Sequence, residues 1–236
     1  MDFLLSRCKR DDGYLLFHCF TNNEAKFPAF LDDFAFLIAA LIHLQEISAN
    51  AGYLVKARQY TEYVLEHFND GEGGTFYYTN HLQRDVVIRK KEVYDGATPS
   101  GNAIMAFNLL YLSVVFDLPE WKNKAIVLCS GLQHAIMNYP SSFANWATLM
   151  QALTYVIPEI VMVGKKIDSH KACFLRDFTP FRIFQAANQQ VDAFPLLMNK
   201  PVLEQTQIYL CRNYACELPI TEVEELREKL IEIREN

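Results

Sequence analysis

The sequence lacks the features that mark membrane and secreted proteins. Its densest apolar run, from Phe34 to Leu44, contains a histidine. It is also shorter than the roughly 18 apolar residues that a membrane-spanning helix needs. Charged residues interrupt the first dozen positions, where a signal peptide would have an apolar core. We therefore expect a chain with no membrane partner.

Positive charge is also scarce. The chain has 22 Lys and Arg against 28 Asp and Glu, a net charge of −6, and its basic residues form only short clusters such as Arg89-Lys90-Lys91. Nucleic-acid surfaces need a basic stripe or patch on one face. We therefore expect no nucleic-acid partner.

Several sequence motifs of cofactor chemistry are missing. There is no P-loop, no GxGxxG after a strand, no GxSxG and no CxxC, and the histidines show no ligand spacing with cysteines or carboxylates. The six cysteines are scattered, several in apolar contexts, which is typical of reduced thiols in a cytoplasmic protein. Cys211 and Cys216 would need a turn at Asn213 and Tyr214 to form a disulfide, and two buried thiols are the favoured interpretation. We predict neither a metal site nor a cofactor.

Apolar and aromatic residues are plentiful. Hydrophobic residues make up 51% of the chain and charged residues 21%, with 12 Tyr and 17 Phe. A soluble chain of 236 residues with this composition can bury a substantial core. Aromatic side chains at this density can also line a cleft that stacks flat ligands or sugars.

Apolar periodicity predicts a repeated pair of helices. Residues 33–48 are apolar nearly all round, as in a buried inner helix, with Asp32 as its N-cap. Residues 51–68 have one apolar stripe, as in an outer helix. The pattern recurs at 99–116, where Thr98 would cap and Pro99 would be the first helical residue, and in helices that begin at Pro119 and near Ser141. Such hairpins predict a mainly α fold, a partial α/α-toroid.

Two other segments have a different character. The glycine-rich turn at 70–74 precedes the β-branched and aromatic runs 75–79 and 85–89, which predict an inserted β-hairpin. After residue 154, strands are expected at 156–164, 181–187 and 206–211, with helices at 168–178 and after the capping box that begins at Thr221. We expect a toroid segment at 1–154 and a small α/β C-terminal appendage at 155–236 packed on it.

Polar residues gather where two inner helices should begin. Asp33 and Asp95 are candidate acid/base residues, and Asp32 is a candidate ligand-binding residue, because such helix ends would face one opening of a ring. Ordinary helix capping is the alternative. Gly101 costs a helix roughly 1 kcal/mol against Ala, which indicates that a ligand or a neighbouring helix comes close there.

Further residues are candidates for the same ligand site. Ser100 and Asn102 would contact and orient a ligand, Tyr77 or Tyr94 would offer a stacking face, and Glu72 would place a carboxylate at the rim. Plain turn formation is the alternative for Glu72 and its neighbouring glycines. His43 and Glu46 are three residues apart in one helix and can touch, which favours a satisfied core histidine.

Four stretches also resemble a known family. They are FLDDFAFLI at 30–38, GGTFY at 73–77, YDGATPSGN at 94–102 and CRNYACELP at 211–219. They resemble, in order, the C-terminal region of the thioredoxin-domain-containing, spermatogenesis-associated protein 20-like family, whose bacterial members are called YyaL-like. The resemblance implies a thioredoxin-like domain followed by a toroid of the six-hairpin glycosidase kind.

The resemblance covers the chain from about residue 13 onward and corresponds to the last third of such proteins. Because the chain has no thioredoxin-like domain and no CxxC, it implies no redox role. The first hairpins of the ring are also missing, and an incomplete ring would expose inner-helix surface. We therefore expect self-association or a missing N-terminal toroid or thioredoxin-like portion.

Two functional hypotheses follow. The first is binding or processing of a carbohydrate-like small molecule at the N-terminal ends of the inner helices; the fold relationship itself supplies no reaction. The alternative is a non-catalytic scaffold or interaction module that works with a thioredoxin-like domain. If Asp33 and Asp95 both point into one open, aromatic-lined pocket, the first gains support; if both only cap helices and no pocket forms, the second does.

Overall fold

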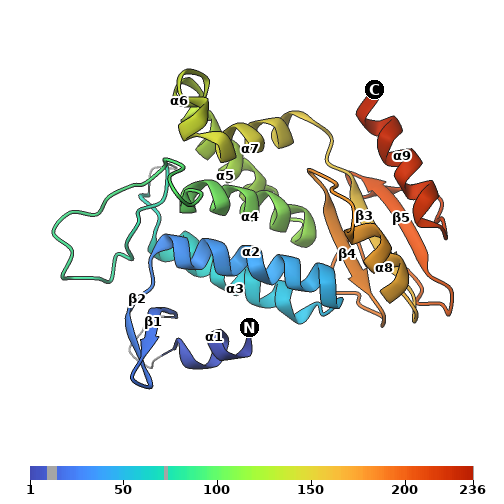
Figure 1. Ribbon diagram of the computed structural model, residues 1–236, viewed down its shortest axis with the longest axis horizontal. Coiled ribbons are helices and arrows are strands. Elements are labelled where there is room, and N and C mark those ends of the chain that lie inside the picture. The colour runs from blue at the N-terminus through green and yellow to red at the C-terminus, as the bar shows by residue number, and fades with distance from the viewer. Residues whose placement is uncertain (10–14, 72–73, 236) are drawn as a thin grey trace.

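The computed structural model describes residues 1–9, 15–71 and 74–235 (Figure 1). In this part the chain is mainly α-helical, with a small strand pair near the N-terminus and a mixed sheet near the C-terminus. None of the helices in these ranges is long and apolar enough to cross a membrane.

The helical part is built from two pairs of helices. The inner helices α2 and α4 pack on each other, and each packs on the helix that follows it, α3 or α5. The predicted inner and outer helices are thereby confirmed. A short helix, α6, and a 3-10 turn at Pro140–Ser142 lead into α7, which packs on α4 and α5. The bounds are α1 Asp2–Arg7, α2 Leu31–Ser48, α3 Gly52–His67, α4 Gly101–Phe116, α5 Pro119–Ser130, α6 Gln133–Asn138 and α7 Ala144–Thr154.

Both inner helices begin at other residues than predicted. The N-cap of α2 is Phe30, so Asp32 lies inside the first turn. The N-cap of α4 is Ser100, so Thr98 does not cap this helix and Pro99 precedes it. The start of α5 at Pro119 is as predicted, with proline in the first turn, where its missing N–H costs nothing.

The β-hairpin predicted at 75–89 is wrong. The described residues between Gly74 and Ser100 form no strand, although their side chains favour one. Side chains satisfy part of this backbone instead: Asn102 bonds both N–H and C=O of Phe76, and Arg89 donates to the carbonyl of Thr79. A hairpin that was not predicted lies earlier, where β1 (Phe17–Thr21) pairs with β2 (Glu24–Pro28).

The C-terminal part holds a four-stranded sheet in the order β4-β3-β5-β6. Strand β3 is parallel to β4 and antiparallel to β5, so β3 is central. Strand β3 begins at Glu159 and not at residue 156, because Pro158 immediately precedes it and has no N–H for a ladder hydrogen bond. The expected strands and helices of this part are confirmed with small shifts. The bounds are β3 Glu159–Val163, α8 Asp168–Leu175, β4 Ile183–Ala187, β5 Gln207–Arg212, β6 Ala215–Cys216 and α9 Val223–Glu235.

The turn between β5 and β6 corrects the prediction for the cysteines. Asn213 and Tyr214 have φ values of 48° and 64°, as in the tight two-residue turns that join antiparallel strands. The turn brings Cys211 opposite Cys216, with Cα atoms 3.9 Å apart, and the two form a disulfide. Cys211 is buried and Cys216 is exposed, so they are not two buried thiols.

The sheet has a core on each face. Val161, Val163 and Ile183 belong to the hydrophobic cluster of the helical part. The alternate residues, such as Ile160 and Met162, belong to a second cluster with α8 and α9. Because side chains of a strand alternate between faces, the sheet lies between these two layers. Each fully buried Val or Ile contributes roughly 1.5–3 kcal/mol through removal of apolar surface from water.

Candidate functional site

Asp33 holds the start of α2. Its Oδ2 accepts a hydrogen bond from the backbone N–H of Phe30 at 2.8 Å. Its carboxylate oxygens also lie 2.8 and 3.0 Å from Nδ1 of His18 on β1. Both oxygens are therefore engaged in joining the N-terminus of α2 to the first hairpin, and this arrangement supports a capping role.

Asp95 joins two helices. Its Oδ1 accepts from the N–H of Ser100 at 2.9 Å, at the start of α4. Its Oδ2 accepts from the N–H of Asn145 at 2.8 Å, at the start of α7. Backbone N–H groups at helix starts have no partner within the helix, and a carboxylate there also interacts favourably with the helix dipole. These contacts, too, are those of a capping residue.

Asp32 lies where α2 and α4 come closest. Burial raises the pKa of Asp32, the negative charges of Asp33 and Glu92 raise it further, and a hydrogen bond from the backbone of Gly101 opposes this rise. The N-terminal ends of the two inner helices are therefore adjacent, as the sequence predicted. Gly101 permits the close approach of a neighbouring helix, so the packing explanation of this glycine is confirmed.

Asn102 is buried and fully hydrogen-bonded. Its Oδ1 accepts from the N–H of Phe76 at 2.7 Å, and its Nδ2 donates to the carbonyls of Phe76 and Glu92 at 3.0 and 2.8 Å. Ser100 donates from its hydroxyl to the carbonyl of Glu92 at 3.2 Å. Both residues therefore fasten the loop before α4 to the helix, which leaves the amide of Asn102 with no free hydrogen-bonding group.

The remaining candidates of this region are Tyr77, Tyr94 and Glu72. The guanidinium of Arg89 lies 4.0 Å and the ammonium of Lys91 4.9 Å from the ring centre of Tyr77, so cations already occupy that ring. Tyr94 is exposed and contacts the ring of Phe143. It lines a depression of about 400 Å³ with residues 88–92. Glu72 lies outside the described residues.

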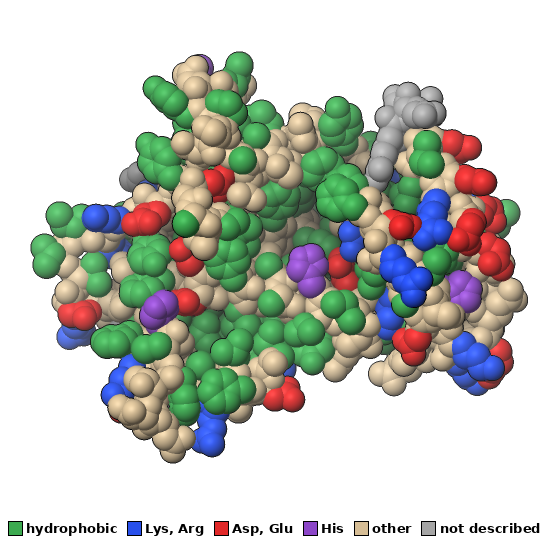
Figure 2. Space-filling model, in the orientation of Figure 1, with side chains coloured by type: hydrophobic (Ala, Val, Ile, Leu, Met, Phe, Trp, Pro, Cys, Tyr) green, Lys and Arg blue, Asp and Glu red, His purple; other side chains and the backbone are tan. Residues whose placement is uncertain are grey.

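A larger cleft, the central cleft, lies beside the C-terminal half of α2. It has a volume of about 660 Å³ and is walled by α2, α4, α7 and the segment that leads into β4. Figure 2 shows a hollow near the middle of this face, surrounded mainly by hydrophobic side chains. A pocket of this size with few polar groups is typical of small-molecule sites. Its apolar lining includes Ile42, Ile104, Phe107, Leu110, Ile157, Phe178, Phe181 and Ile183.

A buried carboxylate lies at the centre of the polar groups in this cleft. The side chain of Glu46 is 5% exposed. Its Oε1 accepts from the hydroxyl of Tyr111 at 3.1 Å, and its Oε2 lies 3.2 Å from both Nη2 of Arg182 and Nδ1 of His43. A buried charge is tolerated when it is paired and hydrogen-bonded, as here. The four side chains come from α2, α4 and the start of β4.

His43 contacts Glu46 as the spacing predicted, but it is not a core residue. Its side chain is 68% exposed. The hydrogen bond to Glu46 raises the pKa of His43, while partial burial and the positive charge of Arg182 act against this rise. The cleft therefore has, at its rim, a histidine that exchanges protons with solvent and faces a fixed carboxylate.

Hydrogen-bonding and aromatic groups complete the lining. Asn145, Thr148 and Gln151 lie on α7 at helical spacing, so they share one side of that helix. Phe178 lines the cleft with 88% of its surface exposed. Thr179 fixes this segment, because its carbonyl accepts from Nη1 of Arg182 at 2.9 Å. The arrangement can hold a ring by stacking and its polar groups by hydrogen bonds.

Of the contacts in this polar cluster, the sequence predicted only the one between His43 and Glu46. His43 and Glu46 are close in sequence, and their spacing was the signal. Tyr111 and Arg182 lie 65 and 136 residues from Glu46, so no local pattern connects them. Only the packing of α4 and β4 against α2 brings them together.

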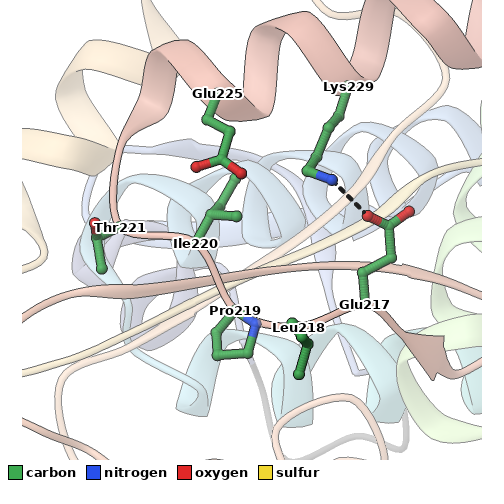
Figure 3. A pocket seen from close by; sticks show the side chains of 7 residues that line it. All are labelled: Glu217, Leu218, Pro219, Ile220, Thr221, Glu225 and Lys229. Atoms are coloured by element: carbon green, nitrogen blue, oxygen red, sulfur yellow. Dashed lines mark hydrogen bonds and ion pairs between the residues drawn. The ribbon is translucent and has the colours of Figure 1, made fainter.

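Another depression lies at the C-terminal end of the chain (Figure 3). It has a volume of about 480 Å³ and is lined by residues 217–221 together with Glu225 and Lys229 of α9. Nζ of Lys229 points toward Glu217 and lies 2.9 Å from its Oε2. The charge of Lys229 is therefore paired. Leu218, which also lines the depression, is 89% exposed, so the depression is shallow at this residue. Among the described residues, no group of three or more His, Cys, Asp or Glu could hold a metal ion.

The structure is that of a mainly α-helical protein with a mixed sheet and a cleft large enough for a small-molecule ligand. No protein-family model matches the chain. It is 27% identical over 212 residues to spermatogenesis-associated protein 20 of Rattus norvegicus and 28% identical to that of Homo sapiens. Each comparison covers 85% of this chain and 27% of the relative. An uncharacterised protein of Caenorhabditis elegans is 26% identical over 210 residues, which cover 85% of this chain and 28% of that protein.

The chain is therefore homologous to spermatogenesis-associated protein 20. It spans about a quarter of the length of the curated relatives that it matches.

Proposed function

We propose that the chain binds a carbohydrate-like small molecule in the central cleft. The observation that carries the proposal is the composition of two walls of the cleft. Asn145, Thr148 and Gln151 offer amide and hydroxyl groups from α7, and Phe178 and Phe181 offer aromatic faces from the segment before β4. A sugar ring has hydroxyl groups at its edge and C–H groups on its faces, so both walls have a matching part of the ligand.

The position of the carboxylates favours binding over hydrolysis. Most glycoside hydrolases place two carboxyl groups on either side of the scissile bond. Among the described residues that line the cleft, Glu46 is the one carboxylate, and Tyr111, Arg182 and His43 already surround it. The N-terminal ends of α2 and α4 offer less support for a ligand, because Asp33, Asp95 and Asn102 use their oxygens in capping and loop contacts.

Thermal-shift measurements with a panel of mono- and oligosaccharides test the proposal. Thr148→Ala and Gln151→Ala remove exposed polar groups from the cleft wall, and Thr154→Ala is the matched control on the same helix outside the lining. We expect a sugar to raise the Tm of the parent and of Thr154→Ala, and to raise it less in the two cleft variants. Asp33→Asn and Asp95→Asn extend the test to the helix ends. The absence of a shift with every sugar, or equal shifts in the cleft variants, contradicts the proposal.

A second candidate function is that of a non-catalytic scaffold for a thioredoxin-like domain in a longer protein. The capping contacts of Asp33 and Asp95 favour it, because they give these two aspartates a structural role at the helix ends. The pairing of α2 with α3 and of α4 with α5 supports a place for this chain in a partial α/α-toroid, and the short span of its relatives that it covers supports a longer whole protein. Self-association and a cytoplasmic location belong to the same proposal.

A further inference from the structure

We propose that Cys211 and Cys216 form a reversible thiol–disulfide exchange site whose reaction partner is a dithiol that attacks the sulfur of Cys216. The two cysteines are joined across the β5–β6 hairpin. Cys216 is exposed, whereas Cys211 is buried with no exposed surface. An external thiolate can therefore approach one sulfur of the pair and not the other.

The difference in exposure between the two cysteines fixes the course of the exchange. The thiolate of the dithiol attacks Sγ of Cys216, forms a mixed disulfide there and releases Cys211, whose sulfur takes a proton. The second thiol of the partner then attacks the partner's own sulfur in the mixed disulfide and releases Cys216 as a thiol. The protein pair gains two electrons and two protons, and the partner leaves as a disulfide.

Contacts other than the disulfide also hold the hairpin, and the proposal requires that they keep its shape when the disulfide is reduced. The N–H of Tyr214 donates to Oε2 of buried Glu159 at 2.9 Å, and the hydroxyl of Tyr214 donates to the carbonyl of Val114 in α4 at 2.9 Å. The N–H of Glu217 donates to the carbonyl of Leu210 at 3.0 Å. We expect these contacts to keep the two thiols opposite each other after reduction, so that re-oxidation is an intramolecular closure of a short loop.

The same hairpin distinguishes a dithiol from a monothiol. After a monothiol has attacked Cys216, the freed Cys211 remains next to the mixed disulfide and can reverse the step. With a dithiol, the second sulfur of the reagent attacks the mixed disulfide before Cys211 does and releases Cys216 as a thiol. The other buried thiols are unsuited to the reaction, because burial raises the pKa of Cys8 and of Cys129 and disfavours their thiolates.

Acid-quenched alkylation tests the proposal on the folded chain. The air-oxidised protein is incubated with dithiothreitol, or with 2-mercaptoethanol at equal thiol concentration, then quenched with acid, denatured, alkylated and analysed by peptide mass spectrometry. The fluorescence of the buried Trp121 and Trp146 reports whether the chain stays folded. We expect dithiothreitol to convert both cysteines to thiols with unchanged fluorescence, and the monothiol to produce much less of the dithiol form. After removal of dithiothreitol, an excess of oxidised glutathione should restore the pair and leave as two glutathione thiols.

Variants separate exchange from unfolding. Cys19→Ser removes a partly exposed thiol outside the hairpin and should leave the exchange unchanged. The double variant Cys211→Ser/Cys216→Ser should fold, with hydrogen-exchange protection retained at the N–H of Tyr214. The proposal is overturned if reduction requires denaturant, if it unfolds the chain, if both thiol reagents act equally, or if the air-oxidised protein contains two free thiols at these positions.

Discussion

Gly101 of α4 packs directly against Asp32 of α2. A Cβ atom at position 101 would lie 3.1 Å from the Cα atom of Asp32 and would overlap its carboxylate. The two inner helices therefore approach each other at a point where only a hydrogen fits. Glycine is unfavourable in a helix, but at position 101 the close approach of Asp32 requires it.

We predict that Gly101→Ala destabilises the protein. Alanine should gain up to about 1 kcal/mol in helix preference, but overpacking a tight contact costs typically 1–3 kcal/mol, and here both the carboxylate and the Cα atom of Asp32 would have to move. Gly96→Ala is the matched control, because a Cβ atom there meets nothing within 4 Å. Urea unfolding measures both; a Gly101→Ala protein at least as stable as the parent would show that the helices move apart without cost.

We predict that Asp95→Ala also lowers the free energy of unfolding, by about 1–2 kcal/mol. The substitution removes the acceptor for the N–H groups of Ser100 and Asn145, which begin two different helices. Asp85→Ala, at an exposed position of the preceding loop, is the control. Urea unfolding again supplies the measurement, and equal stability of the two variants would leave Asp95 available for a ligand role.

We predict that the pKa of His43 lies above its ordinary value of 6.5 and falls in Glu46→Gln, because the hydrogen bond to Glu46 favours the protonated ring. The pair's contribution to stability is then fully present below pH 6.5 and is lost as the pH rises through the folded-state pKa. Arg182 acts in the opposite direction and stays in both proteins. An NMR titration of the His43 ring measures the pKa, and an unchanged value in Glu46→Gln would refute the assignment.

The helices were predictable because their apolar residues recur with the helical period. The all-round apolar character of 33–48 and the single stripe of 51–68 distinguished an inner from an outer helix, and both assignments hold. The exact starts of α2 and α4 were not predictable. The N-cap position of α4 depends on Asp95, whose carboxylate binds Ser100 from five residues away in a loop.

The strand prediction from local side-chain preference was wrong where side chains satisfy the hydrogen-bonding groups of the backbone. Residues 75–79 have strand-forming side chains, yet Asn102 and Arg89 take the hydrogen bonds that a partner strand would have made. The opposite error occurred at Cys211 and Cys216, where a tight turn that uses two non-glycine residues at positive φ was not expected. For the central cleft, the sequence predicted only the contact between His43 and Glu46, which it assigned to a core histidine; the other polar groups of the cleft come from distant segments. The boundary at residue 154 and the predicted ligand residues stay predictions.

Strand β3 has a consequence for the cooperativity of folding. Its residues 160–163 alternate between the cluster of the helical part and the cluster of α8 and α9, so four consecutive positions contribute to both cores. Loss of β3 would open both layers at once, and a slip of one residue would exchange their side chains. Helices α2 and α4 and helices α8 and α9 should therefore melt in a single transition, although they share few direct contacts.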